Sequence, residues 1–339
     1  MKLKITTRTL ELKHTWTISR GSSDSKTYNF IELEDEGVVG LGEAAHNIRY
    51  DESLESIHDF LQEAAALLKD ANPAAFFELG LAVNQLGMGQ QAAKAAIDIA
   101  LMDWNAKKLG VPLHRILGLQ SNKTPLTSYS IGIDKLEIMQ QKIIEARDYP
   151  ILKIKLGGDD DEAIMHAVRE VTNKIIRVDA NEGWVDRNEA LEKIKWLARM
   201  GVEFVEQPMP ANRLDDIAWL RQHSPLPLVA DEDVKTARDI PALAMAYDGI
   251  NIKIMKSGGL QEAWRMILLA RSLGLKIMLG CMVESSLGIS AAAQLSPLVD
   301  WADLDGNLLI RNDPFQGASV KAGKIILPNA TGVGVQPMM

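Results

Sequence analysis

The feature that most constrains the fold is a series of apolar segments, each closed by a charged residue at a nearly constant spacing. The closing residues lie 24, 27, 25 and 22 positions apart and are Lys155, Asp179, Glu206, Asp231 and Lys253. A strand followed by a crossover helix needs about that length. Eight apolar segments with strand character lie near 125–133, 150–156, 175–180, 202–206, 226–231, 249–254, 275–281 and 298–303. This α/β alternation predicts a (β/α) barrel of the TIM type.

A different pattern precedes the repeat. Strands are predicted over Lys2–Leu12, Thr27–Leu33 and Val38–Glu43, and helices over Ser53–Lys69 and Gln91–Leu109. We therefore expect an α+β capping domain at 1–115, a modified (β/α)7β barrel at 116–312, and a C-terminal segment at 313–339. That segment is rich in Gly and Pro, has a short strand near Lys324–Leu327 and no room for another βα unit, so we expect it to return to the capping domain.

Composition narrows the class of protein. The 339 residues are 47% hydrophobic and 24% charged, as in an ordinary globular protein. The net charge of −8 argues against a nucleic-acid partner, and no stretch of about 18 apolar residues predicts a membrane span. The N-terminus lacks the apolar core of a signal peptide, and a single cysteine excludes an intrachain disulfide. These features predict a cytoplasmic enzyme or a small-molecule binder.

Several predicted barrel strands carry charged residues on the face that points into the barrel, where side chains fill the interior of a closed barrel. In the segment 151–156, Lys153 and Lys155 share the face opposite to Leu152 and Ile154. A buried ammonium is costly unless it is paired or lies near the open mouth. A solvated strand face or a helix cap explains any one such charge. Three carboxylates that close three consecutive strands, with lysines on the strands before and after, instead indicate a site.

Active sites of such barrels lie at the C-terminal mouth, where Asp179, Glu206 and Asp231 would be neighbours. Three carboxylates without Cys or His suit Mg²⁺. Lys155 and Lys253 come from the second and sixth strands, on opposite sides of the ring, and could move a proton between two faces of one carbon. Removing a proton α to a carboxylate needs such a base, a metal and nearby cations. We expect the clustered lysines to have lowered pKa values.

These segments resemble the muconate-lactonizing-enzyme subgroup of the enolase superfamily over essentially the whole chain. The matching motifs are Leu152-Lys153-Ile154-Lys155-Leu156-Gly157, Val178-Asp179-Ala180-Asn181, Val205-Glu206-Gln207-Pro208, Ala230-Asp231-Glu232, and Asn251-Ile252-Lys253 followed by Gly258-Gly259. The resemblance implies one Mg²⁺ per subunit on Asp179, Glu206 and Asp231. It implies Lys155 and Lys253 as the acid/base pair, with Lys256 as a rival to Lys253. Lys153 would support the substrate carboxylate, and a homo-oligomer is expected.

The eighth strand ends in Asp303-Leu304-Asp305, which resembles the dipeptide epimerases, where such a pair binds the substrate ammonium. A capped strand end explains the pair equally well when it is taken alone. Arg20, in the loop after the first strand, would bind a second substrate carboxylate. The resemblance thus points to Xaa-Glu dipeptides such as L-Ala-L-Glu and L-Ala-D-Glu, from peptidoglycan turnover. Residues placed on the pocket wall are Ser130, Cys281, Met282 and Tyr50; Glu284 receives no role beyond support.

Two other readings stay open. N-acylamino-acid racemisation, o-succinylbenzoate synthesis or muconate cycloisomerisation would use the same scaffold, but would leave Asp303 and Asp305 without a substrate ammonium. A non-catalytic ligand-binding barrel would be expected to lack a metal ligand or a lysine, and none is missing.

Overall fold

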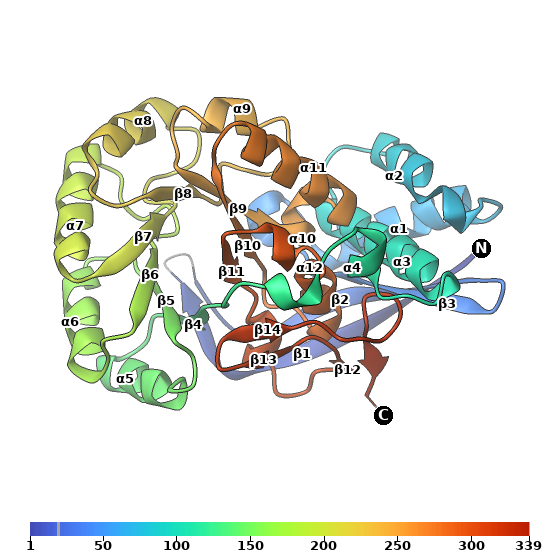
Figure 1. Ribbon diagram of the computed structural model, residues 1–339, viewed down its shortest axis with the longest axis horizontal. Helices are drawn as coiled ribbons and strands as arrows, with labels where there is room; N and C mark the ends of the chain where they lie inside the picture. Colours follow the sequence, from blue (N-terminus) through green and yellow to red (C-terminus); the bar gives the residue numbers. More distant parts are fainter. Residues whose placement is uncertain (19–20, 339) are drawn as a thin grey trace.

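The structure is a computed structural model that describes residues 1–18 and 21–338. Its larger part is a parallel sheet of eight strands, in the order β4 to β11 (Figure 1). The strands are β4 (Tyr129–Ile131), β5 (Ile151–Lys155), β6 (Ile175–Asp179), β7 (Val202–Glu206), β8 (Leu228–Ala230), β9 (Gly249–Lys253), β10 (Lys276–Gly280) and β11 (Trp301–Asp303). The sheet closes next to β4, where Thr127 forms a parallel bridge with Ala302 and Ser128 donates its N–H to the Ala302 carbonyl at 3.1 Å.

Helices fill the seven connections and cover the outside of the barrel (Figure 1). They are α5 (Leu136–Glu145), α6 (Asp161–Val171), α7 (Arg187–Arg199), α8 (Leu214–His223), α9 (Ile240–Leu243), α10 (Ile254–Ser257), α11 (Leu260–Ser272) and α12 (Ser286–Ala293), with the 3-10 turn η4 (Ser296–Leu298) before β11. A second 3-10 turn, η5 (Gly306–Leu309), follows β11. Every predicted barrel segment contains one observed strand. The predicted modified (β/α)7β barrel is therefore confirmed.

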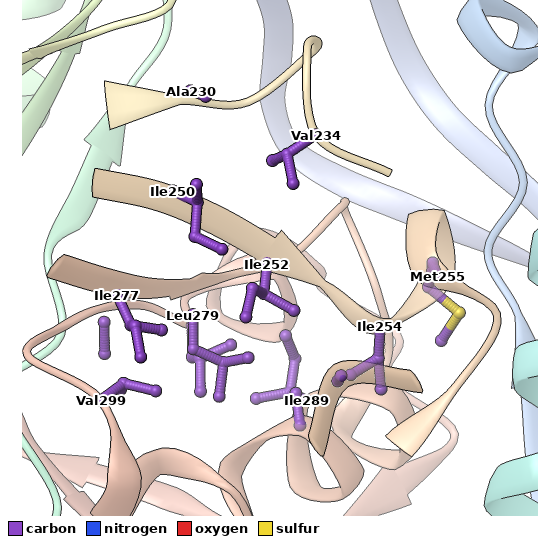
Figure 2. Packing of buried hydrophobic residues seen from close by; sticks show 14 of the residues in the cluster. Ala230, Val234, Ile250, Ile252, Ile254, Met255, Ile277, Leu279, Ile289 and Val299 are labelled. Atoms are coloured by element: carbon purple, nitrogen blue, oxygen red, sulfur yellow. The ribbon is translucent and has the colours of Figure 1, made fainter. Parts of the chain in front are cut away.

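Alternation along the strands separates apolar from polar side chains. Figure 2 shows Ile252 of β9 beside Leu279 of β10, facing Ile289 of α12 in the layer between strands and helices. Asn251 and Lys253 point to the opposite side of β9, into the barrel, because successive side chains alternate. Both are buried. The apolar outer face of the strands thus packs against the helices, and polar side chains lie on the inner face.

The N-terminal part is an α+β cap, as predicted. An antiparallel sheet is formed by β1 (Lys2–Ile18), β2 (Gly21–Asp35) and β3 (Val38–Ala44). It is followed by η1 (Ile48–Tyr50), α1 (Leu54–Leu68), η2 (Pro73–Ala75), α2 (Phe76–Gln85), α3 (Gln91–Lys108), α4 (Leu113–Ile116) and η3 (Ser121–Lys123). The first two strands run further than predicted, and the unpredicted α2 is a ten-residue helix without a side-chain N-cap hydrogen bond.

Helix α3 lies unusually close to β3. A Cβ at Gly40 would stand 2.0 Å from the Ala100 carbonyl oxygen, and one at Gly42 would stand 2.1 Å from that of Ala96. No side chain fits such a gap, so the glycines of the strand and the alanines of the helix are matched. This contact joins the sheet and helices of the cap into one unit.

The C-terminal segment contains β12 (Phe315–Gln316), β13 (Ser319–Lys321), β14 (Lys324–Ile326) and β15 (Gln336–Pro337). It contacts the cap near both of its ends. The Phe315 ring lies against the Phe30 ring of β2 at a centroid distance of 5.9 Å, and the Val333 N–H donates to Asp103 Oδ1 at 2.7 Å. The boundaries at 115 and 312 stay predictions. Within 1–18 and 21–338, no helix has both the length and the apolar character needed to cross a membrane.

Candidate active site

The three predicted metal ligands meet at the C-terminal mouth of the barrel. Asp179 and Glu206 are the last residues of β6 and β7, which pair directly, and Asp231 follows β8. At least one carboxylate oxygen from each lies within 4.8 Å of the others. All three residues are at most 1% exposed. Parallel strands in register thus bring three residues spaced 25–27 positions apart into one cluster.

A lysine flanks this acidic triad on each side. Lys155 Nζ lies 2.6 Å from Asp179 Oδ2, and Lys253 Nζ lies 2.7 Å from Asp231 Oδ2. Their strands, β5 and β9, are four apart in the ring of eight. Both lysines line the large cavity at the barrel mouth. The geometry therefore presents two amines to one space from opposite sides.

Lys256, the rival to Lys253, occupies a different environment. Its ammonium donates to Asp231 Oδ1 at 2.6 Å and to the Asp231 and Asn251 carbonyls at 2.5 and 3.1 Å. It is 2% exposed and does not line the cavity. With three acceptors around it, Lys256 is suited to hold Asp231 in place, and Lys253 is the lysine that reaches the cavity.

Lys153 lies at the centre of the mouth. Its Nζ is 2.7 Å from Glu206 Oε2, 2.8 Å from Asp303 Oδ2 and 3.3 Å from Asp179 Oδ2. The predicted partner was the substrate carboxylate, whereas the observed partners are three carboxylates of the protein. Lys153 therefore connects the triad to the last barrel strand, and it also lines the cavity.

The three carboxyls of the triad differ in pKa: that of Glu206 is raised, and those of Asp179 and Asp231 are lowered. Burial, together with the neighbouring charge of Asp179, raises the pKa of Glu206 to about 7. Burial also opposes ionisation of Asp179, but Lys155 and Lys153 outweigh it and lower the pKa of Asp179 to about 2. Lys253 and Lys256 hold the pKa of Asp231 well below its usual range, against the effect of burial. Glu206 resists ionisation even with these lysines nearby, so the cluster favours a bound cation that would stabilise its ionised form.

The predicted lowering of the lysine pKa values is wrong for two of the lysines. Burial lowers the pKa of Lys153 and Lys253, but contact with carboxylates more than reverses this, so both pKa values are raised. For Lys256, burial outweighs the charge of Asp231, and the pKa is lowered. Repulsion among the lysines and from a metal would lower these pKa values, but Lys153 and Lys253 contact carboxylates directly at 2.7–3.3 Å, and this attraction is stronger.

Asp303 and Asp305 both reach the same cavity, from the end of β11. Ser128 Oγ and Lys153 Nζ donate to Asp303 at 2.6 and 2.8 Å, and the Ser130 N–H donates to Asp305 Oδ2 at 2.6 Å. Burial opposes ionisation of both, but Lys153 lowers the pKa of Asp303, while burial and the Asp303 charge raise the pKa of Asp305 to about 7. A bound cation beside Asp305 would favour its ionised form.

The cavity has a volume of about 710 Å³ and lies between the barrel mouth and the cap. Of the predicted wall residues, Ser130, Cys281 and Met282 line it, whereas Tyr50 does not. The Tyr50 ring instead faces Lys235 Nζ at 5.6 Å from its centroid. Arg20 lies outside the described residues.

Two site features were absent from the sequence interpretation. Asn251 Nδ2 donates to Glu206 Oε1 at 2.8 Å and thereby orients a triad member. Its position on the same strand face as Lys253 was the available signal. Arg49 of η1 forms a two-pronged ion pair with Glu182, after β6, at 2.8 and 3.0 Å. No signal could reveal that contact, because the partners are 133 positions apart and in different structural units.

The donor set of the triad fits Mg²⁺. Its members offer carboxylate oxygens, without Cys or His, and a bound divalent ion would compensate their buried negative charge. The three come from adjacent strands of a closed barrel, so the cluster is formed by the fold itself.

The chain is similar to known proteins over nearly its whole length. Residues 2–118 match the mandelate racemase/muconate lactonizing enzyme N-terminal domain, and residues 137–339 match the enolase C-terminal domain-like family. The L-Ala-D/L-Glu epimerase of Bacteroides thetaiotaomicron is 46% identical, over 99% of this chain and 88% of that protein. The L-Ala-D/L-amino acid epimerase of Pedosphaera parvula is 44% identical, over 97% of each.

A solved structure has the same architecture. The dipeptide epimerase of Cytophaga hutchinsonii, complexed with Mg and D-Ala-L-Val, superposes with a TM-score of 0.94 at 26% identity, over 99% of this chain and 95% of that one. With the matches over both of its parts, the chain belongs to the mandelate racemase/muconate lactonizing enzyme family of the enolase superfamily and is an isomerase of the racemase and epimerase class.

Proposed function

We propose that the protein is a Mg²⁺-dependent dipeptide epimerase that inverts the second residue of Xaa-Glu dipeptides such as L-Ala-L-Glu. The observation that carries the proposal is the pair Lys155 and Lys253, which face one cavity from strands on opposite sides of the acidic triad. Such dipeptides arise in peptidoglycan turnover. The cytoplasmic location and the homo-oligomer stay predictions.

The reaction needs a proton to leave one face of the α-carbon and another to arrive on the opposite face. Asp179, Glu206 and Asp231 would hold Mg²⁺, which supplies Lewis-acid stabilisation of the substrate carboxylate as negative charge develops. One of Lys155 and Lys253, as the neutral amine, takes the α-proton and becomes an ammonium. The other, as the ammonium, donates a proton to the opposite face and becomes an amine. Lys153 adds positive charge near the enediolate.

The far side of the mouth would recognise the dipeptide's free amine. Asp303 and Asp305 form a carboxylate pair on the cavity wall. Asp303 already holds Lys153, so Asp305 is the member with more capacity to accept from a substrate ammonium. An N-acylated amino acid has no such ammonium, which favours a dipeptide over N-acylamino-acid racemisation, o-succinylbenzoate synthesis or muconate cycloisomerisation.

Preference for Glu at the second position rests on Arg20 as a partner for its side-chain carboxylate, and on the similarity to an L-Ala-D/L-Glu epimerase. The second similar enzyme is named for L-Ala-D/L-amino acids, so a broader preference is the alternative. Ser130, Cys281 and Met282 would shape the wall around the substrate; Tyr50 is off the cavity and receives no substrate contact.

The test is proton NMR of L-Ala-L-Glu in D₂O with the protein and Mg²⁺. We expect deuterium at the Glu α position together with signals of a second diastereomer. Exchange with N-succinyl amino acids but not with dipeptides would overturn the assignment of Asp303 and Asp305. Exchange with L-Ala-L-Leu as fast as with L-Ala-L-Glu would overturn the preference for Glu.

A further inference from the structure

We propose that Lys26, on β2 of the cap, is a specificity-determining residue that binds the side-chain carboxylate of the dipeptide's second residue. The inference rests on the proposed function and adds a second cation to the recognition assigned there to Arg20. On the cap side of the cavity, the described residues include one ammonium without an acidic partner, that of Lys26.

Strand alternation points Lys26 toward the cavity. It lies two positions before Tyr28, so the two side chains share one face of β2. Tyr28 is buried, and its ring meets His46 edge-on at a centroid distance of 5.3 Å. All three residues line the cavity. The aliphatic stem of Lys26 can therefore rest on the cap while its ammonium reaches the open space.

Lys26 differs from the other described cations of the cavity wall. Arg49 is paired with Glu182, and the barrel lysines 153, 155 and 253 each contact at least one carboxylate. No carboxylate within the described ranges lies within 4.0 Å of Lys26 Nζ. Glu52 shares the cavity wall, but its Oε1 accepts from the Ala92 N–H.

The surroundings of Lys26 increase the value of an incoming anion. Lys26 is half-buried, and this burial lowers its pKa. Burial and the charge of Lys26 also lower the pKa of His46, so the imidazole stays neutral and adds no competing charge near pH 7. A half-desolvated ammonium without a counter-ion interacts more strongly with a carboxylate than a fully hydrated one does.

The position of Lys26 indicates which group of the substrate it would bind. The acidic triad, with its metal, occupies the centre of the mouth and accounts for the main-chain carboxylate. Asp303 and Asp305 account for the ammonium. The remaining anion of an Xaa-Glu dipeptide is the Glu side chain, and the cap wall is the part of the cavity left for it.

The experiment compares kcat/KM for L-Ala-L-Glu and its neutral isostere L-Ala-L-Gln in the wild type and Lys26→Met. A charge-assisted hydrogen bond predicts about a thirtyfold loss with L-Ala-L-Glu and less than a threefold loss with L-Ala-L-Gln. Lys4→Met is the matched control, because Lys4 is an exposed lysine of the same sheet that does not line the cavity. It should change neither value by more than twofold.

Charge reversal gives a second test that requires a gain. Lys26→Glu should raise the preference for L-Ala-L-Lys over L-Ala-L-Glu at least a hundredfold relative to the wild type. Equal losses with the Glu and Gln substrates in Lys26→Met, or no shift in preference in Lys26→Glu, would overturn the assignment of Lys26 while dipeptide epimerisation stands. Absence of turnover of every dipeptide by the wild type would instead overturn the proposed function itself.

Discussion

The barrel mouth and the cap wall line the same cavity, but their charged side chains differ in burial and in ion pairing. At the barrel mouth, lysines and carboxylates are almost fully buried, and each of Lys153, Lys155 and Lys253 contacts a carboxylate at 2.6–2.8 Å. On the cap wall, Lys26 is half-buried without such a partner, and the Arg49 side chain is 36% exposed. From this difference we expect the chemical step to depend on the preformed network of the mouth, and substrate choice to depend on Lys26, which has no carboxylate partner among the described residues.

The two regions also differ in how they are supported. The barrel residues are on neighbouring strands in register, so moving one displaces several partners. The cap residues lie on one long hairpin and on η1, which is tied to the barrel by the contacts of Arg49, Tyr50 and Asn47 with three separate loops. Substitutions at the mouth should therefore affect kcat, and substitutions on the cap should mostly affect KM.

The largest effect is expected for Lys253→Ala. Epimerisation should fall by about a thousandfold or more, because one of the two proton-transfer groups is lost. Deuterium exchange from one epimer should survive, since Lys155 still serves its own face. The matched control is Lys276→Ala, an exposed lysine at the other end of the neighbouring strand. Exchange from both epimers at wild-type rates would transfer the role to Lys256.

The next largest effect is expected for Asp303→Asn. Dipeptide turnover should fall about a hundredfold, because Lys153 loses one of its three carboxylate partners and the substrate ammonium loses half of its site. Mg²⁺ affinity, measured by calorimetric titration, should stay within about threefold of the wild type. An equal loss of turnover and of Mg²⁺ affinity would contradict the ammonium role.

A third effect concerns stability where the two regions meet. Glu43 at the end of β3 accepts from Ser285 and Gly288 of α12, and Glu284 accepts from the Met282 N–H at 2.8 Å. Burial raises the pKa of Glu43 to about 7, and burial with the Glu43 charge raises that of Glu284 to about 8. Between about pH 4.5 and 8, these two carboxyls therefore hold more protons in the folded protein than in the unfolded chain.

The sign of the pH dependence follows from that excess of protons. The free energy of unfolding should fall by about 6 kcal/mol as pH rises from 5 to 8, since the pKa values of both Glu43 and Glu284 are raised on folding. Urea unfolding with saturating Mg²⁺ at each pH measures this. Glu284→Gln should flatten the curve, whereas the exposed control Glu192→Gln should keep it. A free energy that rises with pH in the wild type would show that these two carboxyls do not dominate.

The smallest effect is expected for Arg49→Ala. A partly exposed ion pair contributes about 1 kcal/mol, so KM should rise about fivefold with kcat nearly unchanged. Glu182→Gln and the double variant complete a cycle. Additive effects of the two single changes would mean that the pair does not hold η1 to the barrel.

The predictable part of the site was the part set by strand alternation. Alternation predicts Lys155, Asp179 and Lys253 on the inner face of the barrel, and the structure has all three buried at the carboxyl ends of their strands. The contact between Lys153 and Asp303 joins residues 150 positions apart, and only barrel closure brings them together. The position of Tyr50 and the Arg49–Glu182 pair depend on how η1 sits over the mouth, which no sequence period encodes.

Hydrogen bonds between the cap and residues near the end of the chain have a consequence for folding during synthesis. The Arg311 N–H donates to the Glu11 carbonyl of β1 at 2.9 Å, and the Leu113 N–H donates to the Gly332 carbonyl at 2.8 Å. These partners are about 300 and 220 positions apart, so at about 5–20 residues per second the later ones are translated tens of seconds after the earlier. In a ribosome-bound chain, the first cap strands and most of the barrel are synthesised well before these hydrogen bonds can form. The contacts of Arg311 and Gly332 with the cap are thus among the last to form in the nascent protein.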